Sequence, residues 1–123
     1  MDNQADRFDL EQLAENAKRA STLLKAMANQ HRLMVLCQLV KGEKNVGELE
    51  RIIGLSQSAL SQHLARLRRD RIVKTRRVAQ TIYYSLSGEE ASAIIETLYT
   101  LYADKGDAPS FEPGAEAPKA RVR

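Results

Sequence analysis

Residues 55–86 change from a helical to an extended pattern, and this change constrains the fold more than any other feature of the chain. The segment begins with apolar residues at the three- and four-residue spacing of one helical face, Ala59, Leu60, Leu64 and Leu67. Two runs of β-branched and aromatic residues follow, at 72–76 and 81–86, and flank the short polar stretch 77–80. The segment therefore predicts a short helix followed directly by a β-hairpin.

Helical patterns are also found on both sides of this segment. Each stretch of helical apolar spacing follows a residue that commonly caps a helix. The expected helices are 10–27 after Asp9, 30–40 after Asn29, 46–53 after Asn45, 57–69 after Ser56 and 88–103 after Ser87. Gly54 permits the left-handed turn that ends the third of these helices. The pattern predicts a mainly helical protein with a small β-hairpin, a winged helix-turn-helix.

Positive charge is concentrated in the same part of the chain. Residues 57–80 contain one acid, Asp70, whereas the formal net charge of all 123 residues is only +3. The basic residues in this stretch are Arg66, Arg68, Arg69, Arg71, Lys74, Arg76 and Arg77. A local positive field beside uncharged hydrogen-bonding side chains is typical of a surface that binds double-stranded DNA.

The fourth helix has polar residues on the side away from its apolar stripe. Gln can pair with adenine through two hydrogen bonds, and Ser can bond to any base edge. Backbone amides at the helix N-terminus can hold a phosphate. The expected DNA contacts of this helix are Ser56, Gln57, Ser58, Ser61 and Gln62. The alternative is that these residues only solvate a surface helix, which is their usual role.

Basic residues flank the fourth helix on two sides. Arg66 lies on the helix, and Arg76 and Arg77 are expected at the tip of the hairpin, so the three suit the two phosphate walls of one groove. Gln80, also at the tip, is a candidate for the minor groove. His63 adjoins the apolar stripe, where packing or a phosphate contact are both open. A solvated charged face remains the alternative for the arginines.

Size and composition limit the other possibilities. A hydrophobic fraction of 43% in 123 residues suits one domain. We expect a flexible N-terminus at 1–8, a DNA-binding and dimerisation domain at 9–104 and a disordered tail at 105–123. No apolar run reaches membrane length and no signal-peptide pattern opens the chain, so no membrane partner is expected. The single cysteine, Cys37, fits the reducing cytoplasm.

The sequence resembles the ArsR/SmtB family of winged-helix bacterial regulators. The resemblance runs from about Ala20 to Ala103, through LLKAMANQHRLMVLCQL, VGELERIIGLSQSALSQHLARLR and TRRVAQTIYYSLS. It is strongest to the branch that holds the haemolysin-gene activator, the nodulation-gene repressor and the sulfide-responsive repressors. The resemblance implies a homodimer built from the first and last helices. It also implies binding to an imperfect inverted repeat near a promoter, at the bacterial nucleoid.

The sequence differs from the family that it resembles at the positions where members of that family bind metals or react with persulfides. Metal-sensing members have cysteines at the start of the third helix or histidines on the last helix; here these stretches are NVGELE and GEEASAIIETLYTLYAD. Persulfide-sensing members pair a cysteine at the position of Cys37 with a second one near Ala103, which is not cysteine here. We therefore expect no metal site, no cofactor and no dithiol switch. Cys37 is left as a candidate single-thiol redox site, with inert packing as the alternative.

These features distinguish three classes of function. The expected function is a sequence-specific DNA-binding transcriptional regulator, acting as a repressor on an inverted-repeat operator. The alternative is a winged-helix module that binds protein, such as an anti-repressor, which would not need uncharged base-contacting residues on the fourth helix. An enzyme is not expected, because the sequence has no Gly-rich phosphate loop, no nucleophile elbow and no zinc-like spacing of His31, His63 and Cys37.

Overall fold

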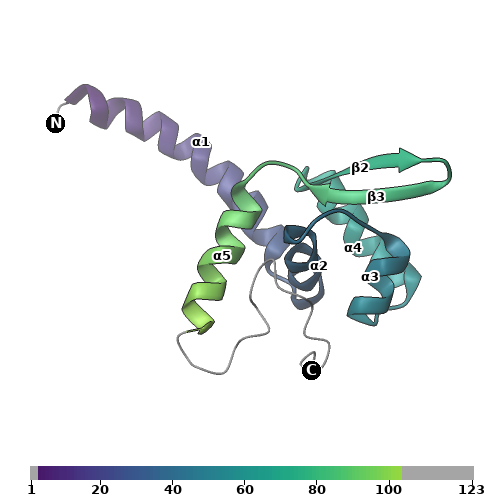
Figure 1. The fold of residues 1–123 in the computed structure, drawn as a ribbon. Coiled ribbons are helices and arrows are strands. Elements are labelled where there is room, and N and C mark those ends of the chain that lie inside the picture. Colours follow the sequence, from purple (N-terminus) through teal and green to yellow (C-terminus); the bar gives the residue numbers. More distant parts are fainter. Residues whose placement is uncertain (1–2, 104–123) are drawn as a thin grey trace.

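The computed structural model describes the backbone of residues 3–103 and the side chains of residues 9–103. The elements are α1 (Asn3–Met27), α2 (Gln30–Val40), β1 (Lys44–Asn45), α3 (Val46–Ile53), α4 (Gln57–Arg69), β2 (Val73–Val78), β3 (Thr81–Leu86) and α5 (Glu90–Ala103). Helices α2, α3 and α4 pack together, the β2–β3 hairpin projects to one side as the wing, and α1 projects to the other (Figure 1). The predicted winged helix-turn-helix is confirmed. The expected tail at 105–123 lies outside the described residues.

Three of the expected caps hold their helices. The Asn29 side chain accepts hydrogen bonds from the backbone of His31 and Arg32, both at 3.0 Å, and begins α2. Asn45 and Glu48 form a reciprocal capping box at the start of α3, with bonds of 2.8 and 2.9 Å. The Ser56 hydroxyl accepts from the Ala59 amide at 3.2 Å and begins α4. The start of the helix that carries the candidate DNA contacts is therefore fixed by local chemistry.

Two helices begin at residues other than those expected. Helix α1 already begins at Asn3, so Asp9 lies within it and is not its cap. Helix α5 begins at Glu90, two residues after the expected start at Gly88. Gly88 has φ +88°, which is incompatible with a right-handed helix, and the Ser87 amide donates instead to the Ile72 carbonyl at 2.9 Å. Ser87 therefore closes the end of the hairpin and does not cap α5.

The sheet has one strand more than expected and a tighter turn. The two-residue strand β1 pairs antiparallel with β3, in the order β1-β3-β2. Strand β2 extends to Val78, which pairs with Thr81, so the turn consists of Ala79 and Gln80 alone. Ala79 has φ +58°, as a tight hairpin turn requires. Arg76, expected at the tip, consequently lies within β2 opposite Tyr83.

The core lies where α2, α3 and α4 meet the base of the wing and α5. The predicted stripe of α4 faces this core, since its leucines are almost fully buried. The buried residues are Ala26, Met27, Val35, Leu36, Leu39, Leu49, Leu60, Leu64, Leu67, Ile72, Val73, Ala91 and Ile95. Burial of α4 on this side leaves its opposite side free to face a partner.

The two terminal helices present large apolar side chains to the surface. Leu10 and Leu13 of α1 are 68% and 62% exposed, and Leu101 and Tyr102 of α5 are 55% and 52% exposed. One chain does not cover these residues, so the exposed apolar side chains of α1 and α5 are candidates for a contact with another protein. Among the described residues, no helix has both the length and the apolar character needed to cross a membrane.

Candidate DNA-binding surface

The outer side of α4 is polar, exposed and free of acidic residues. The five predicted contacts of this helix lie there together and are all exposed: Ser56, Gln57, Ser58, Ser61 and Gln62. The Ser56 hydroxyl already accepts the capping bond from Ala59, so its amide rather than its side chain is offered to a ligand. The other four present hydrogen-bonding groups that no partner within the described residues occupies. This surface matches the chemistry of base edges in a major groove.

Helix α4 is held rigidly at both ends. On the N-terminal side, Gly54 has φ +87° and its amide donates to the Glu50 carbonyl at 2.9 Å, which closes the turn between α3 and α4. On the C-terminal side, the Ile72 amide donates to the Leu67 carbonyl and the Arg71 amide to the Arg68 carbonyl, at 2.9 and 3.0 Å. These two bonds form a Schellman motif. The helix therefore presents its outer side in a fixed orientation.

The arginines of α4 differ in their ion pairs and in their exposure. Arg66 and Arg69 both bind Asp70, at 3.1 and 3.2 Å. Burial pushes the pKa of Asp70 upward, but the hydrogen bonds from these two arginines outweigh it and leave that pKa below its ordinary value. Arg66 is half-buried, whereas Arg68 is exposed. Arg66, a predicted DNA contact, therefore lies in an ion pair with Asp70 when no DNA is bound.

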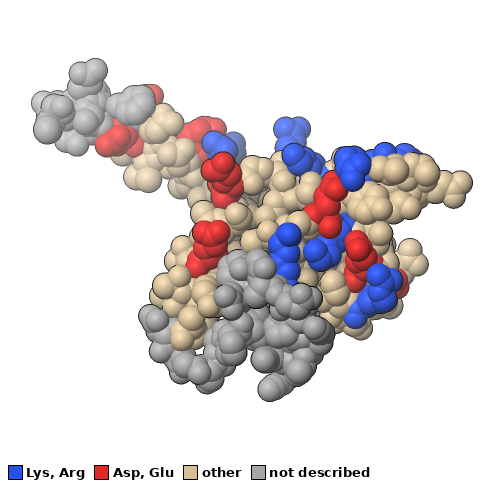
Figure 2. Space-filling view, in the orientation of Figure 1, with Lys and Arg blue, Asp and Glu red and all other residues tan. Residues whose placement is uncertain are grey.

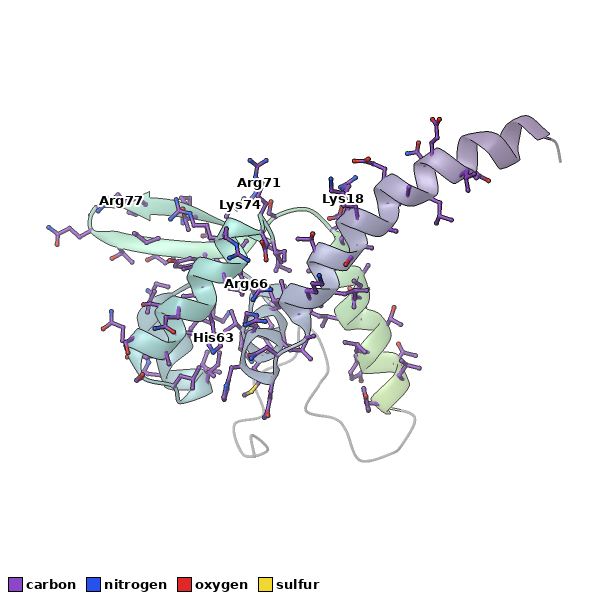
Figure 3. All side chains as sticks on the ribbon, turned by 180° about the vertical axis from the view of Figure 1, so that it is seen from behind. Lys18, His63, Arg66, Arg71, Lys74 and Arg77 are labelled. Atoms are coloured by element: carbon purple, nitrogen blue, oxygen red, sulfur yellow. The ribbon has the colours of Figure 1, made fainter. Side chains whose placement is uncertain are left out.

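The two arginines of the wing, Arg76 and Arg77, make different contacts. Arg76 makes two hydrogen bonds to Glu43, at 2.8 and 2.9 Å, and its guanidinium lies 5.1 Å from the centre of the Tyr83 ring. These bonds lower the pKa of Glu43. Arg77 lies near the outer end of the hairpin and donates to the Ala79 carbonyl at 3.2 Å (Figure 3). Arg76 therefore braces the wing, while Arg77 and the exposed Gln80 occupy its end.

Positive side chains gather along one edge of the molecule. Figure 2 shows Lys and Arg along the wing and between the wing and α1, with acidic side chains on α1 and near the base of the wing. The outer side of α4 is thus accompanied by cations on the helix itself and on the wing. This distribution suits a polyanion whose backbone passes on both sides of α4.

His63 is half-buried, and its ring lies beside that of His31. The two rings lie 5.9 Å apart between centroids, with an angle of 41° between their planes. The sequence does not predict this contact, because 32 positions separate the two residues. Burial lowers the pKa of His63, and the positive charges of Arg32 and His31 lower it further. The packing interpretation of His63 is therefore the one that the geometry favours.

The lowered pKa of His63 predicts a pH dependence of stability. As the pH falls below the ordinary value of 6.5, the unfolded chain binds a proton at this position before the folded one does. We expect His63 to titrate below pH 6.5 by NMR, and the free energy of unfolding to decrease as the pH falls from 6.5 through the folded pKa. His63→Gln should reduce that decrease. Titration of His63 at or above pH 6.5 would contradict the contact described here.

Cys37 is half-buried on α2 and packs against the core. Burial raises the pKa of its thiol to about 12, although the charge of Lys41 acts in the opposite direction. Only the thiolate reacts with electrophiles and disulfides. The geometry therefore favours inert packing over a redox site.

Cys37 should accordingly react slowly with thiol reagents. With a pKa of about 12 in place of 9.0, the thiolate fraction near neutral pH falls by roughly three orders of magnitude. We expect alkylation of the folded protein by iodoacetamide to be slower than that of the unfolded chain by about this factor. Cys37→Ser should leave DNA affinity unchanged with and without oxidant. Rapid modification of the folded protein would restore the single-thiol switch.

Within residues 9–103, no group of three or more His, Cys, Asp or Glu side chains is arranged to hold a metal ion.

Comparison with known proteins shows the family to which this chain belongs. Residues 29–75, which cover α2 to the beginning of β2, match the model of the arsR family of bacterial regulatory proteins. The transcriptional activator HlyU of Vibrio cholerae is 54% identical over 95 residues, which are 77% of this chain and 88% of HlyU. The chain belongs to the ArsR family.

Other ArsR-family comparisons agree in sequence and in structure. Nodulation protein NolR of Rhizobium meliloti is 50% identical over 99 residues, 80% of this chain and 81% of NolR. A solved structure of HlyU from Vibrio cholerae superimposes with a TM-score of 0.69 at 57% identity, over 72% of this chain and 96% of that one. This ArsR-family chain is thus a DNA-binding transcriptional regulator with a winged helix-turn-helix fold, in a family of regulators rather than enzymes.

Proposed function

We propose that this ArsR-family regulator binds an inverted-repeat operator at a promoter as a homodimer and represses transcription there. The observation that supports this most strongly is the outer side of α4, which is exposed, polar and free of acids while its inner side is anchored in the core. Gln57, Ser58, Ser61 and Gln62 contact base edges in the major groove. A dimer bound across a promoter excludes RNA polymerase, which makes repression the simplest outcome.

Phosphate contacts position α4 on the duplex. The amides near Ser56, together with Arg66 and Arg77, bind phosphates on either side of the groove. Gln80 at the end of the wing approaches the minor groove. Arg76 and His63 contribute by holding the wing and α4 in place, through Glu43 and His31.

The dimer forms through α1 and α5. Their exposed apolar residues, among them Leu10, Leu13 and Leu101, are buried against the same residues of a second copy. Two-fold symmetry then places the two α4 helices about one duplex turn apart, roughly 34 Å, so that the operator is an inverted repeat. Because the target is chromosomal DNA, the regulator works in the cytoplasm at the bacterial nucleoid.

Neither a metal nor a dithiol switch controls this regulator. The start of α3 has no thiol, α5 has no histidine, and Cys37 is the single cysteine of the chain. A disulfide or polysulfide bridge within one chain needs two sulfurs. DNA occupancy is therefore set by other means, of which protein concentration is the simplest.

The salt dependence of binding tests the proposal. The operator is first located by a genome-wide footprint of the protein on its own chromosome, and gel shifts on that fragment are then recorded over a range of salt concentrations. For about six to eight phosphate contacts in the dimer, log K should fall with log[salt] at a slope of roughly −5 to −7. A flat dependence would contradict the proposal and favour a module that binds protein.

A further inference from the structure

A row of exposed cations extends from the wing to α1. Figure 3 shows Arg77, Lys74, Arg71 and Lys18 following one edge of the molecule, above Arg66 and His63 on α4. Arg77 belongs to the wing contact already proposed. The other three lie away from the end of the wing, with Lys74 near the start of β2, Arg71 in the turn between α4 and β2, and Lys18 on α1. They are therefore not explained by contacts within the groove that α4 occupies.

Arg71 is the most unusual residue of this row. It follows the C-cap of α4 with φ +63°, a left-handed conformation that glycine adopts without steric cost and arginine does not. Its side chain is exposed and makes no hydrogen bond or ion pair within residues 9–103. Arginine at this position therefore destabilises the turn, and its side chain gains no hydrogen bond or ion pair within residues 9–103. Strained residues of this kind cluster at functional sites.

Nearby acids are mostly engaged by other partners. Asp70, next to Arg71 in the chain, binds Arg66 and Arg69. Glu90 on α5 lies 3.7 Å from Arg19. Lys18 and Arg71 line the same groove between α1 and the turn from α4 to β2, where Glu15 is the remaining acid. Net positive charge is thus left on Lys18 and Arg71, in line with Lys74.

We propose that Lys18, Arg71 and Lys74 form a second phosphate-binding surface, which contacts the backbone of the duplex between the two half-sites. The proposal rests on the proposed function. The row is continuous with the wing at one end and reaches α1, the proposed dimer helix, at the other. Its α1 end therefore lies close to the two-fold axis, where the centre of an inverted repeat must pass. An extended row of cations continuous with a DNA contact fits a phosphate backbone.

Neutral phosphates test this surface directly. Two operator duplexes are compared by fluorescence anisotropy, one natural and one with methylphosphonates at the central phosphates. The variant Arg71→Gly removes two phosphate contacts from each dimer. It should bind the natural duplex roughly 10- to 30-fold more weakly than the wild type at 0.15 M salt, and its salt slope should be smaller by about 2. Because methylphosphonates also remove the contacts of Lys18 and Lys74, the wild type should lose more than this on the methylphosphonate duplex, whereas Arg71→Gly should lose less than the wild type does.

Two controls separate the possible outcomes. Arg71→Gly should unfold at the same temperature as the wild type or higher, because glycine suits φ +63°, so weaker binding cannot come from misfolding. Lys25→Gln removes the same charge from α1 outside the row and should stay as sensitive to methylphosphonates as the wild type. Equal affinity of wild type and Arg71→Gly for the natural operator overturns this inference alone. Failure of the wild type to bind any operator overturns the proposed function.

Discussion

Replacing Gln57 and Ser61 with alanine should abolish the preference for the operator while leaving weak binding to other DNA. Each lost base contact costs about 1–3 kcal/mol, and each occurs twice in a symmetric dimer. Both side chains are exposed on the outer side of α4, so the free energy of unfolding should change by less than about 0.5 kcal/mol. Competition binding with operator and unrelated duplexes measures the ratio of the two affinities.

Arg77→Ala provides the contrast. A phosphate contact contains little base information, so this variant should lose affinity for operator and unrelated DNA alike and should show a shallower salt slope. The ratio of the two affinities should be unchanged. If the alanine variants of α4 behaved in the same way as Arg77→Ala, the outer side of α4 would not be in contact with bases.

Leu13→Glu should convert the protein to a monomer and weaken operator binding by about 10²- to 10⁴-fold. Leu13 is 62% exposed in one chain, so a charge there does not disturb the core. In the proposed dimer the same charge is buried against a second copy, where an unpaired carboxylate is strongly unfavourable. The lost affinity is the gain from linking two half-site contacts in one molecule. Sedimentation equilibrium gives the mass, and gel shifts give the affinity.

Gln12→Glu is the matched control for this experiment. It adds the same charge to the same helix, one position away from the exposed apolar residues of α1. This variant should remain a dimer with ordinary affinity. A dimeric Leu13→Glu protein would show that α1 does not form the interface.

Local signals made much of the fold and of α4 predictable from the sequence. Ser56, Gly54 and the spacing of Leu60, Leu64 and Leu67 act within a few residues, and each behaves in the structure as expected. A cap needs only its own helix, and a periodic stripe needs only one core to face. The order of helices and wing followed from these signals together.

Contacts between distant parts of the chain were not predictable in the same way. Arg76 and Glu43 are 33 positions apart, and no local pattern shows that β1 brings Glu43 to the wing. The contact of His31 with His63 depends likewise on how α2 packs on α4. A two-residue strand such as β1 is too short to show alternation. The left-handed backbone at Arg71 was not predictable because the residue is not glycine, the usual signal for this conformation after a helix.

Methylation interference on the operator tests the central claim most directly, because dimethyl sulfate marks guanine N7 in the major groove and adenine N3 in the minor groove. The account predicts two clusters of interfering N7 positions, about 10–10.5 base pairs apart between centres. It further predicts that replacing a contacted adenine with 7-deazaadenine weakens binding of the wild type but not of Gln57→Ala. Interference confined to adenine N3, together with equal effects of 7-deazaadenine on the variant and the wild type, would show that α4 does not contact bases in the major groove.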